Sequence, residues 1–121
     1  MLLTTAPEIK AAIATMNPIA REAAEMIANH LLQHPEVFSK GDEMQSVAGQ
    51  MTAMAMVRNG ISLSDRARTN RFLEDHGAAI MNVALSIVTF VANEQERKRK
   101  WGWLGKAAAV GAGVLLGSLF G

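Results

Sequence analysis

The chain of 121 residues is long enough for one compact domain, and its net charge is only +1. Half of its residues are apolar but only 5% are aromatic, a composition that favours helices over strands. The absence of cysteine excludes disulfides, thiolate metal sites and cysteine nucleophiles. We therefore predict an all-α protein, a small helical bundle followed by a C-terminal glycine-rich hydrophobic helix.

Two helices are predicted at the start of the chain. The first runs from about Pro7 to Met16, where apolar residues recur at helical spacing and "MNP" then interrupts the pattern. Asn17 can cap a second helix that begins at Pro18 and ends before "QHPEVFSKGD". The second helix carries an apolar face, which predicts that it lies in the core: Ile19, Ala23, Met26, Ile27 and Leu31.

A methionine-rich third helix is predicted from about Asp42 to Arg58, with "NG" as its stop signal. One side of it is apolar: Met44, Val47, Ala48, Met51, Met54 and Ala55. Methionine is flexible, so this side either fills an irregular core or offers an adaptable surface to a partner helix. "SLSD", from Ser62 to Asp65, has the spacing of a capping box and predicts a fourth helix from about Leu63, which we expect to break at "DHG".

The segment "GAAIMNVALSIVTFVA", from Gly77 to Ala92, contains no charged residue. Its polar members Asn82, Ser86 and Thr89, followed by Asn93, form one narrow stripe along a helix that is otherwise apolar. Such a helix is buried either in protein or in lipid. It is short for a membrane span, which favours a core helix.

The C-terminal tail contains a small residue at every fourth position, namely Gly105, Ala109, Gly113, Gly117 and Gly121. On a helix these residues form a smooth face that another helix can approach to backbone contact, the small-xxx-small pattern of membrane helices. In water each interior glycine costs about 0.8 to 1 kcal/mol relative to alanine, so the tail needs a compensating environment. We predict that these five residues mediate helix association.

A basic and tryptophan-containing segment, "RKRKWGWLGK", precedes this row of small residues. Positions 94 to 106 carry a net charge of +3, and the rest of the chain carries −2. Cations beside tryptophans are typical of a cytosolic membrane boundary. We therefore assign seven residues to a membrane interface: Arg97, Lys98, Arg99, Lys100, Trp101, Trp103 and Lys106.

The length of the tail leaves two environments open. Its last uncharged stretch, from Ala107 to Gly121, would extend about 22 Å as a helix, against a hydrocarbon core of about 30 Å. Only seven of the 18 residues from Leu104 onward are strongly apolar, so a single copy would insert weakly. We expect the tail either to associate with other copies or to pack against the segment from Gly77 to Ala92. The alternative is that both segments are buried inside a soluble bundle or a larger protein particle.

Few residues indicate chemistry. His30 and His34 are four apart on a predicted helix and could share a metal, but the sequence fixes no third ligand. Nucleophile-elbow, phosphate-loop, dinucleotide and zinc-protease motifs are absent from the sequence. A group of arginines around the fourth helix (Arg58, Arg66, Arg68 and Arg71) is diluted by nearby acidic residues. We expect no catalysis, cofactor, metal, small-molecule substrate or nucleic acid.

The sequence therefore predicts a helical bundle domain (1–93), a basic hinge (94–103) and a glycine-ladder helix (104–121), all of one non-catalytic protein. The N-terminus lacks the features of a secretory signal, so we expect the bundle in the cytosol and the tail in a membrane, where it drives homo-oligomerisation. One alternative is a structural component of a large assembly, such as an internal or connector protein of a virus particle. Another is a membrane-permeabilising or pore-forming protein.

Overall fold

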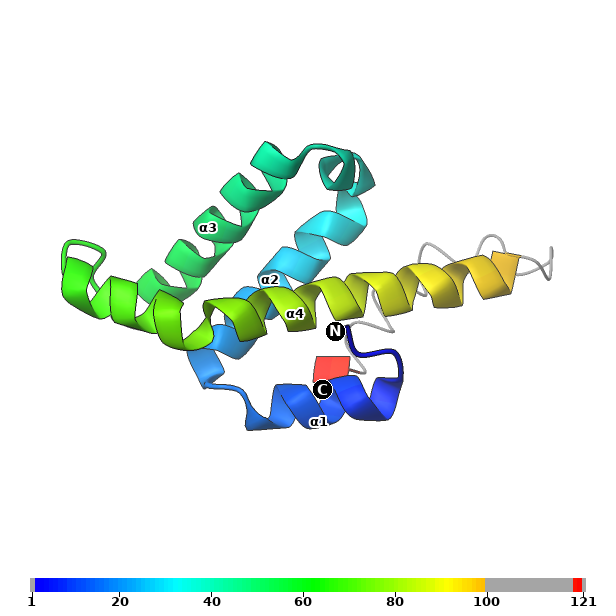
Figure 1. Ribbon diagram of the computed structural model, residues 1–121, viewed down its shortest axis with the longest axis horizontal. Coiled ribbons are helices and arrows are strands. Elements are labelled where there is room, and N and C mark those ends of the chain that lie inside the picture. Colours follow the sequence, from blue (N-terminus) through cyan, green and yellow to red (C-terminus); the bar gives the residue numbers. More distant parts are fainter. Residues whose placement is uncertain (1, 100–118, 121) are drawn as a thin grey trace.

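The computed structural model describes residues 2–99 and 119–120, and all regular structure in this part of the chain is helical. The helices are α1 (Ala6–Thr15), α2 (Pro18–Gln33), α3 (Gly41–Arg58) and α4 (Arg66–Arg99), with the 3₁₀ helix η1 (Pro35–Ser39) between α2 and α3. α2 packs against both α3 and α4, and α1 packs against α4 (Figure 1). The predicted all-α bundle is confirmed, and α2 is its central element.

Side-chain caps fix the first two helices where the sequence predicts them. Thr5 accepts a hydrogen bond from the backbone N–H of Glu8 at the start of α1. Asn17 accepts from the N–H of Ile19 at 2.8 Å and caps α2, with Pro18 in the first turn. These caps satisfy N–H groups that have no partner within the helix.

The buried face of α2 consists mainly of alanine. Ala20, Ala24 and Ala28 recur at every fourth position and are at most 1% exposed, and Ala23 lies beside them at 0%. Ile27 and Leu31 extend this face and are equally buried. Because alanine is small and has no rotamers to order, neighbouring helices can pack closely on α2.

The face of α3 that packs on the core is largely the predicted one, because Ala55 is buried and four further predicted residues are partly buried against the core: Met44, Val47, Ala48 and Met51. Thr52, Ala55 and Met56 are buried, whereas Met54, which we expected on the packed side, is 50% exposed. The buried positions follow the spacing of one helical face centred near Ala55, and Met54 lies about 100° away from it. Because positions 54 and 56 both carry methionine, residue type alone does not indicate which of the two side chains is buried.

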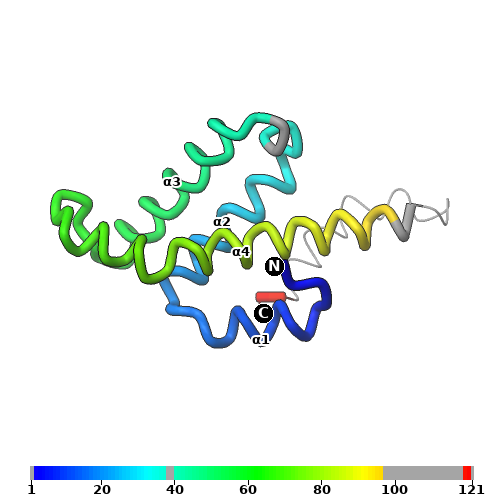
Figure 2. The backbone as a smooth tube through the Cα atoms, viewed as in Figure 1, coloured from blue at the N-terminus to red at the C-terminus, as the bar shows by residue number. Residues whose placement is uncertain are grey.

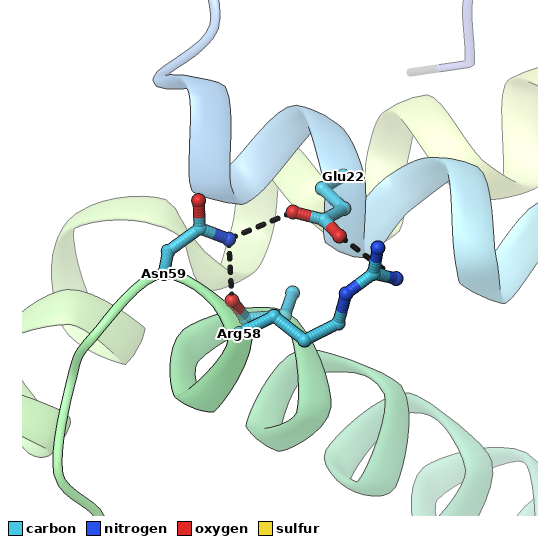
Figure 3. Close-up of polar contacts among 4 residues, drawn as sticks. Glu22, Arg58 and Asn59 are labelled. Carbon is cyan, nitrogen blue, oxygen red and sulfur yellow. Dashed lines mark hydrogen bonds and ion pairs between the residues drawn. The ribbon is translucent and has the colours of Figure 1, made fainter.

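The end of α3 is fixed by Gly60 and by a polar contact with α2. Gly60 has φ +84°, which glycine adopts without strain, so the predicted stop at "NG" is confirmed. The carboxylate of Glu22 on α2 accepts from the Arg58 guanidinium at 3.0 Å and from the Asn59 side-chain amide at 2.7 Å (Figure 3). The same amide donates to the carbonyl of Ala55 at 2.6 Å.

The start of α4 corrects the predicted capping box. α4 begins at Arg66, and its cap is Asp65, whose carboxylate accepts from the N–H of Arg68 at 3.1 Å. The Ser62 hydroxyl instead lies 2.7 Å from the hydroxyl of Ser64. Asp65 is itself a strong N-cap residue, so the helix starts after it and not near Leu63.

The predicted break at "DHG" is also wrong, because α4 continues through Gly77 as one helix of 34 residues (Figure 2). Phe72, Ile80 and Ile87 are all buried and are spaced by about two helical turns, so one apolar face continues across the glycine. Packing of this face outweighs the cost of an interior glycine, which is about 1 kcal/mol. The C-terminal part of α4 extends past the ends of the other helices.

Candidate functional site

Most residues of the predicted association and interface sites lie outside the described part of the chain. These are Lys100, Trp101, Trp103, Gly105, Lys106, Ala109, Gly113, Gly117 and Gly121. Arg97, Lys98 and Arg99 are the final residues of α4 in the described part of the chain.

One helix in the described part of the chain is long and apolar enough to cross a membrane by length and composition. It is the Arg66–Glu96 portion of α4, with 39% of its most apolar window buried within the protein. The buried core helix of a soluble protein passes the same test. The buried residues of this helix end at Val91, and Ala92, Asn93 and Glu96 are exposed. Between Ala92 and Glu96, therefore, α4 has no buried residue.

The polar stripe on α4 separates into a buried and an exposed part. The Ser86 hydroxyl is fully buried and accepts from the backbone N–H of Leu3 at 2.9 Å. Asn82 is half-buried, whereas Thr89 and Asn93 are exposed. Ser86 therefore holds the N-terminal segment against α4, and the other stripe residues do not share this role.

The chain returns to the bundle at its C-terminal end. Leu119 is 5% exposed and Phe120 is 8% exposed, and both belong to the same buried cluster as α1, α2 and α4. The guanidinium of Arg21 on α2 donates to the backbone carbonyl of Phe120. It also lies over the Phe120 ring, with its central carbon 5.9 Å from the ring centroid, the geometry of a cation–π contact.

The two candidate metal-binding histidines lie together at the end of α2. The rings of His30 and His34 have centroids 4.7 Å apart, and Nδ1 of His34 lies 3.4 Å from the carboxylate of Glu36. They line an open hollow of about 340 Å³ with Glu43 on α3. Among the described residues, however, no three potential ligands are placed to hold one metal ion.

A second hollow of about 280 Å³ lies where α1, α2 and α4 meet. Its polar wall comprises Thr15, Asn17, His76 and Asn82. Two of these side chains already serve the fold, because Asn17 caps α2 and Thr15 donates to the carbonyl of Ala12 at 2.9 Å. The His76 ring lies tilted against the Phe72 ring, with ring centroids 4.9 Å apart.

Of the two alternatives for the methionine-rich side of α3, packing in the core accounts for most of its residues, and few apolar side chains are exposed. On α3, Met54 is 50% exposed and Val57 is 55% exposed, while the remaining methionines of this helix are half-buried or buried. Near the start of α4, Leu63 and Leu73 are each 43% exposed. Single exposed apolar residues of this kind are common on soluble surfaces.

Arg21 is not singled out by the sequence, and its contact with Phe120 appears only in the structure. It is the only charged residue in the first four positions of α2, a turn that contains no acidic residue. A cation near a helix N-terminus is disfavoured by the dipole, so its position was a signal that it has a partner elsewhere. That partner, Phe120, is 99 residues away in sequence. Comparison with protein-family models, curated proteins and solved structures finds no match to this chain.

Proposed function

We propose that this chain is a non-catalytic membrane-associated protein that oligomerises through its C-terminal small-residue row, while its helical bundle serves as an interaction domain on the cytosolic side. The arrangement of α4 is the observation that supports this most directly. Val91 is the last buried residue of α4 in the part whose burial is described, which ends at Glu96, and the helix continues as far as Arg99, past the other helices (Figure 1). A basic segment in this place is suited to lipid phosphates.

The charge of this basic segment is the basis of the first test. Arg97, Lys98, Arg99 and Lys100 are all changed to Gln in the full chain, and both proteins are floated with vesicles of phosphatidylcholine and phosphatidylglycerol. Each juxtamembrane cation contributes about 1 kcal/mol near an anionic surface, so the affinity should fall roughly 10²- to 10³-fold. Wild-type protein that stays at the bottom of the gradient at low salt at every vesicle concentration would refute the proposal.

Helix association is tested separately. Gly113→Ile and Gly117→Ile should reduce chemical cross-linking between vesicle-bound copies, because a branched side chain keeps the helices apart. Flotation itself should be retained, since isoleucine is more apolar than glycine. The matched variants Gly113→Ala and Gly117→Ala keep a small residue and should cross-link like the wild type. Equal cross-linking of all variants would exclude the small-residue row as the contact.

A second candidate function is a structural component of a large assembly, with the tail buried in protein. One observation favours it: Ala20, Ala24 and Ala28 on α2 form a small-xxx-small row that packs inside the bundle. The same spacing in the tail would then serve packing between subunits in water. Under this candidate, light scattering without lipid should detect a large particle for the wild type but not for Gly113→Ile. The variant with Gln at positions 97–100 should assemble like the wild type.

A further inference from the structure

Arg21 contacts two groups of Phe120, the backbone carbonyl and the aromatic ring. The guanidinium donates to the carbonyl oxygen and covers the ring face of the same residue. Guanidinium groups suit this dual role because they are planar, multiply donating and weakly hydrated. Arg21 is half-buried, so water competes only partly for its donors.

The burial around this contact makes it a docking site of the bundle. Leu119 and Phe120 are as buried as Val37 or Ile61, which belong to the fold itself. The buried cluster to which they belong also contains Ile9 and Ile13 of α1 and Ala20 of α2. The docked residues close the apolar core on the side where α1 lies (Figure 1).

A docked C-terminal end and a membrane-inserted tail exclude each other. Leu119 and Phe120 lie at the far end of the segment that the proposed function assigns to lipid, and an end held at Arg21 is on the same side as the bundle. For the tail to cross, both side chains must leave the core, and lipid offers them an equally apolar environment. The carbonyl of Phe120 must also give up its charged donor.

We propose that Arg21 acts as a clasp that holds the C-terminal end on the bundle and keeps the tail out of the membrane until the contact is released. This inference rests on the proposed function, because it treats the tail as a membrane segment. The bound form is the structure described here, and the released form exposes the docking site beside Arg21. Insertion is then controlled by one side chain that lies outside the tail.

The clasp is tested first without lipid, by amide hydrogen exchange of the full chain. Arg21→Ala should speed exchange at Leu119 and Phe120 by about 10- to 100-fold, the effect of losing a hydrogen bond to a charged group. Protection at Ile27 and Ile87 should stay as in the wild type and shows that the bundle is still folded. Glu25→Ala, a change at an exposed position on the same helix, is the control.

Two results of this first experiment would overturn the clasp. Unchanged exchange at Leu119 and Phe120 in Arg21→Ala would show that Arg21 does not hold the end. Exchange that slows with protein concentration would show that the end docks on a second copy and not on its own bundle. Arg21→Lys, which keeps the charge but loses the planar fork, should give an intermediate rate.

The second experiment measures flotation with the same anionic vesicles used above. Arg21→Ala should float at a vesicle concentration about 10-fold lower than the wild type needs, because the released form is more populated. One contrary outcome is that the wild type binds vesicles and Arg21→Ala exchanges faster yet floats at the same vesicle concentration as the wild type. In that case release does not control insertion, and the clasp proposal is wrong. If neither protein floats, the proposed function has failed, and faster exchange in Arg21→Ala identifies this case.

Discussion

The backbone N–H of Leu3 donates to the hydroxyl of Ser86 at 2.9 Å, across 83 positions of sequence. Ser86 is fully buried within a helix whose other core residues are apolar. A buried hydroxyl is stable there only if it is hydrogen-bonded, and this bond ties the segment before α1 to the middle of α4.

Replacing Ser86 with alanine should therefore destabilise the protein by about 1 to 3 kcal/mol, because the N–H of Leu3 is left without its partner. Urea unfolding gives the free energy, and amide exchange at Leu3 should accelerate. Thr89→Ala, at an exposed position one turn further along α4, should change stability by less than about 0.5 kcal/mol. Equal effects of the two changes would contradict the assigned role of Ser86.

Loss of the Glu22 carboxylate should weaken the junction between α2 and α3. Its two partners, Arg58 and Asn59, both lie at the end of α3, and the Arg58 side chain is 64% exposed. The ion pair is therefore partly screened, and Glu22→Ala should cost about 1 kcal/mol in urea unfolding. Part of this loss should disappear at high salt. A Glu25→Ala control that costs as much would show that helix propensity, not the contact, is responsible.

Two glycines should respond in opposite directions to replacement by alanine. Gly77 lies inside α4 with open space where a Cβ would be, so Gly77→Ala should stabilise the protein by about 1 kcal/mol. Gly60 also has open space but has φ +84°, so Gly60→Ala should destabilise by about 1 to 2 kcal/mol. Thermal unfolding of the pair checks both signs. Destabilisation by Gly77→Ala would indicate that α4 breaks at this point.

The cap of α4 gives a further test. Asp65→Ala should cost about 0.5 to 2 kcal/mol because the N–H of Arg68 loses its acceptor. Ser62→Ala should cost less than about 0.5 kcal/mol, since its hydroxyl contacts only Ser64 at the surface. A larger loss of unfolding free energy for Ser62→Ala than for Asp65→Ala would contradict this assignment and support the predicted capping box.

The elements with local signals were predictable from the sequence. Asn17 before Pro18 marked the start of α2, and "NG" marked the end of α3, because caps and stops depend only on neighbouring residues. Whether the helix breaks at Gly77 depended on the burial of Phe72 and Ile80 on either side of it. No signal in the neighbouring sequence contains this information. The choice between Met54 and Met56 likewise depended on the orientation of α3 against α2.

The candidate site was only partly accessible to sequence reasoning. Composition and spacing singled out the basic segment and the small-residue row, because lipid recognition depends on those properties. The docking of Phe120 on Arg21 joins residues 99 positions apart, and the carbonyl acceptor is a backbone group that every residue carries. A contact of this kind is visible only in the folded chain.

The alanine face of α2 constrains how this protein can change over evolutionary time. Substitution by a larger residue at Ala20, Ala24 or Ala28 would overpack the core by about 1 to 3 kcal/mol, while glycine would cost about 1 kcal/mol in helix propensity. The exposed side of α3 around Met54 and Val57 bears no such restriction. Divergent relatives should therefore retain a small residue at every fourth position of α2 after most other positions have changed. That pattern is the feature by which to find them.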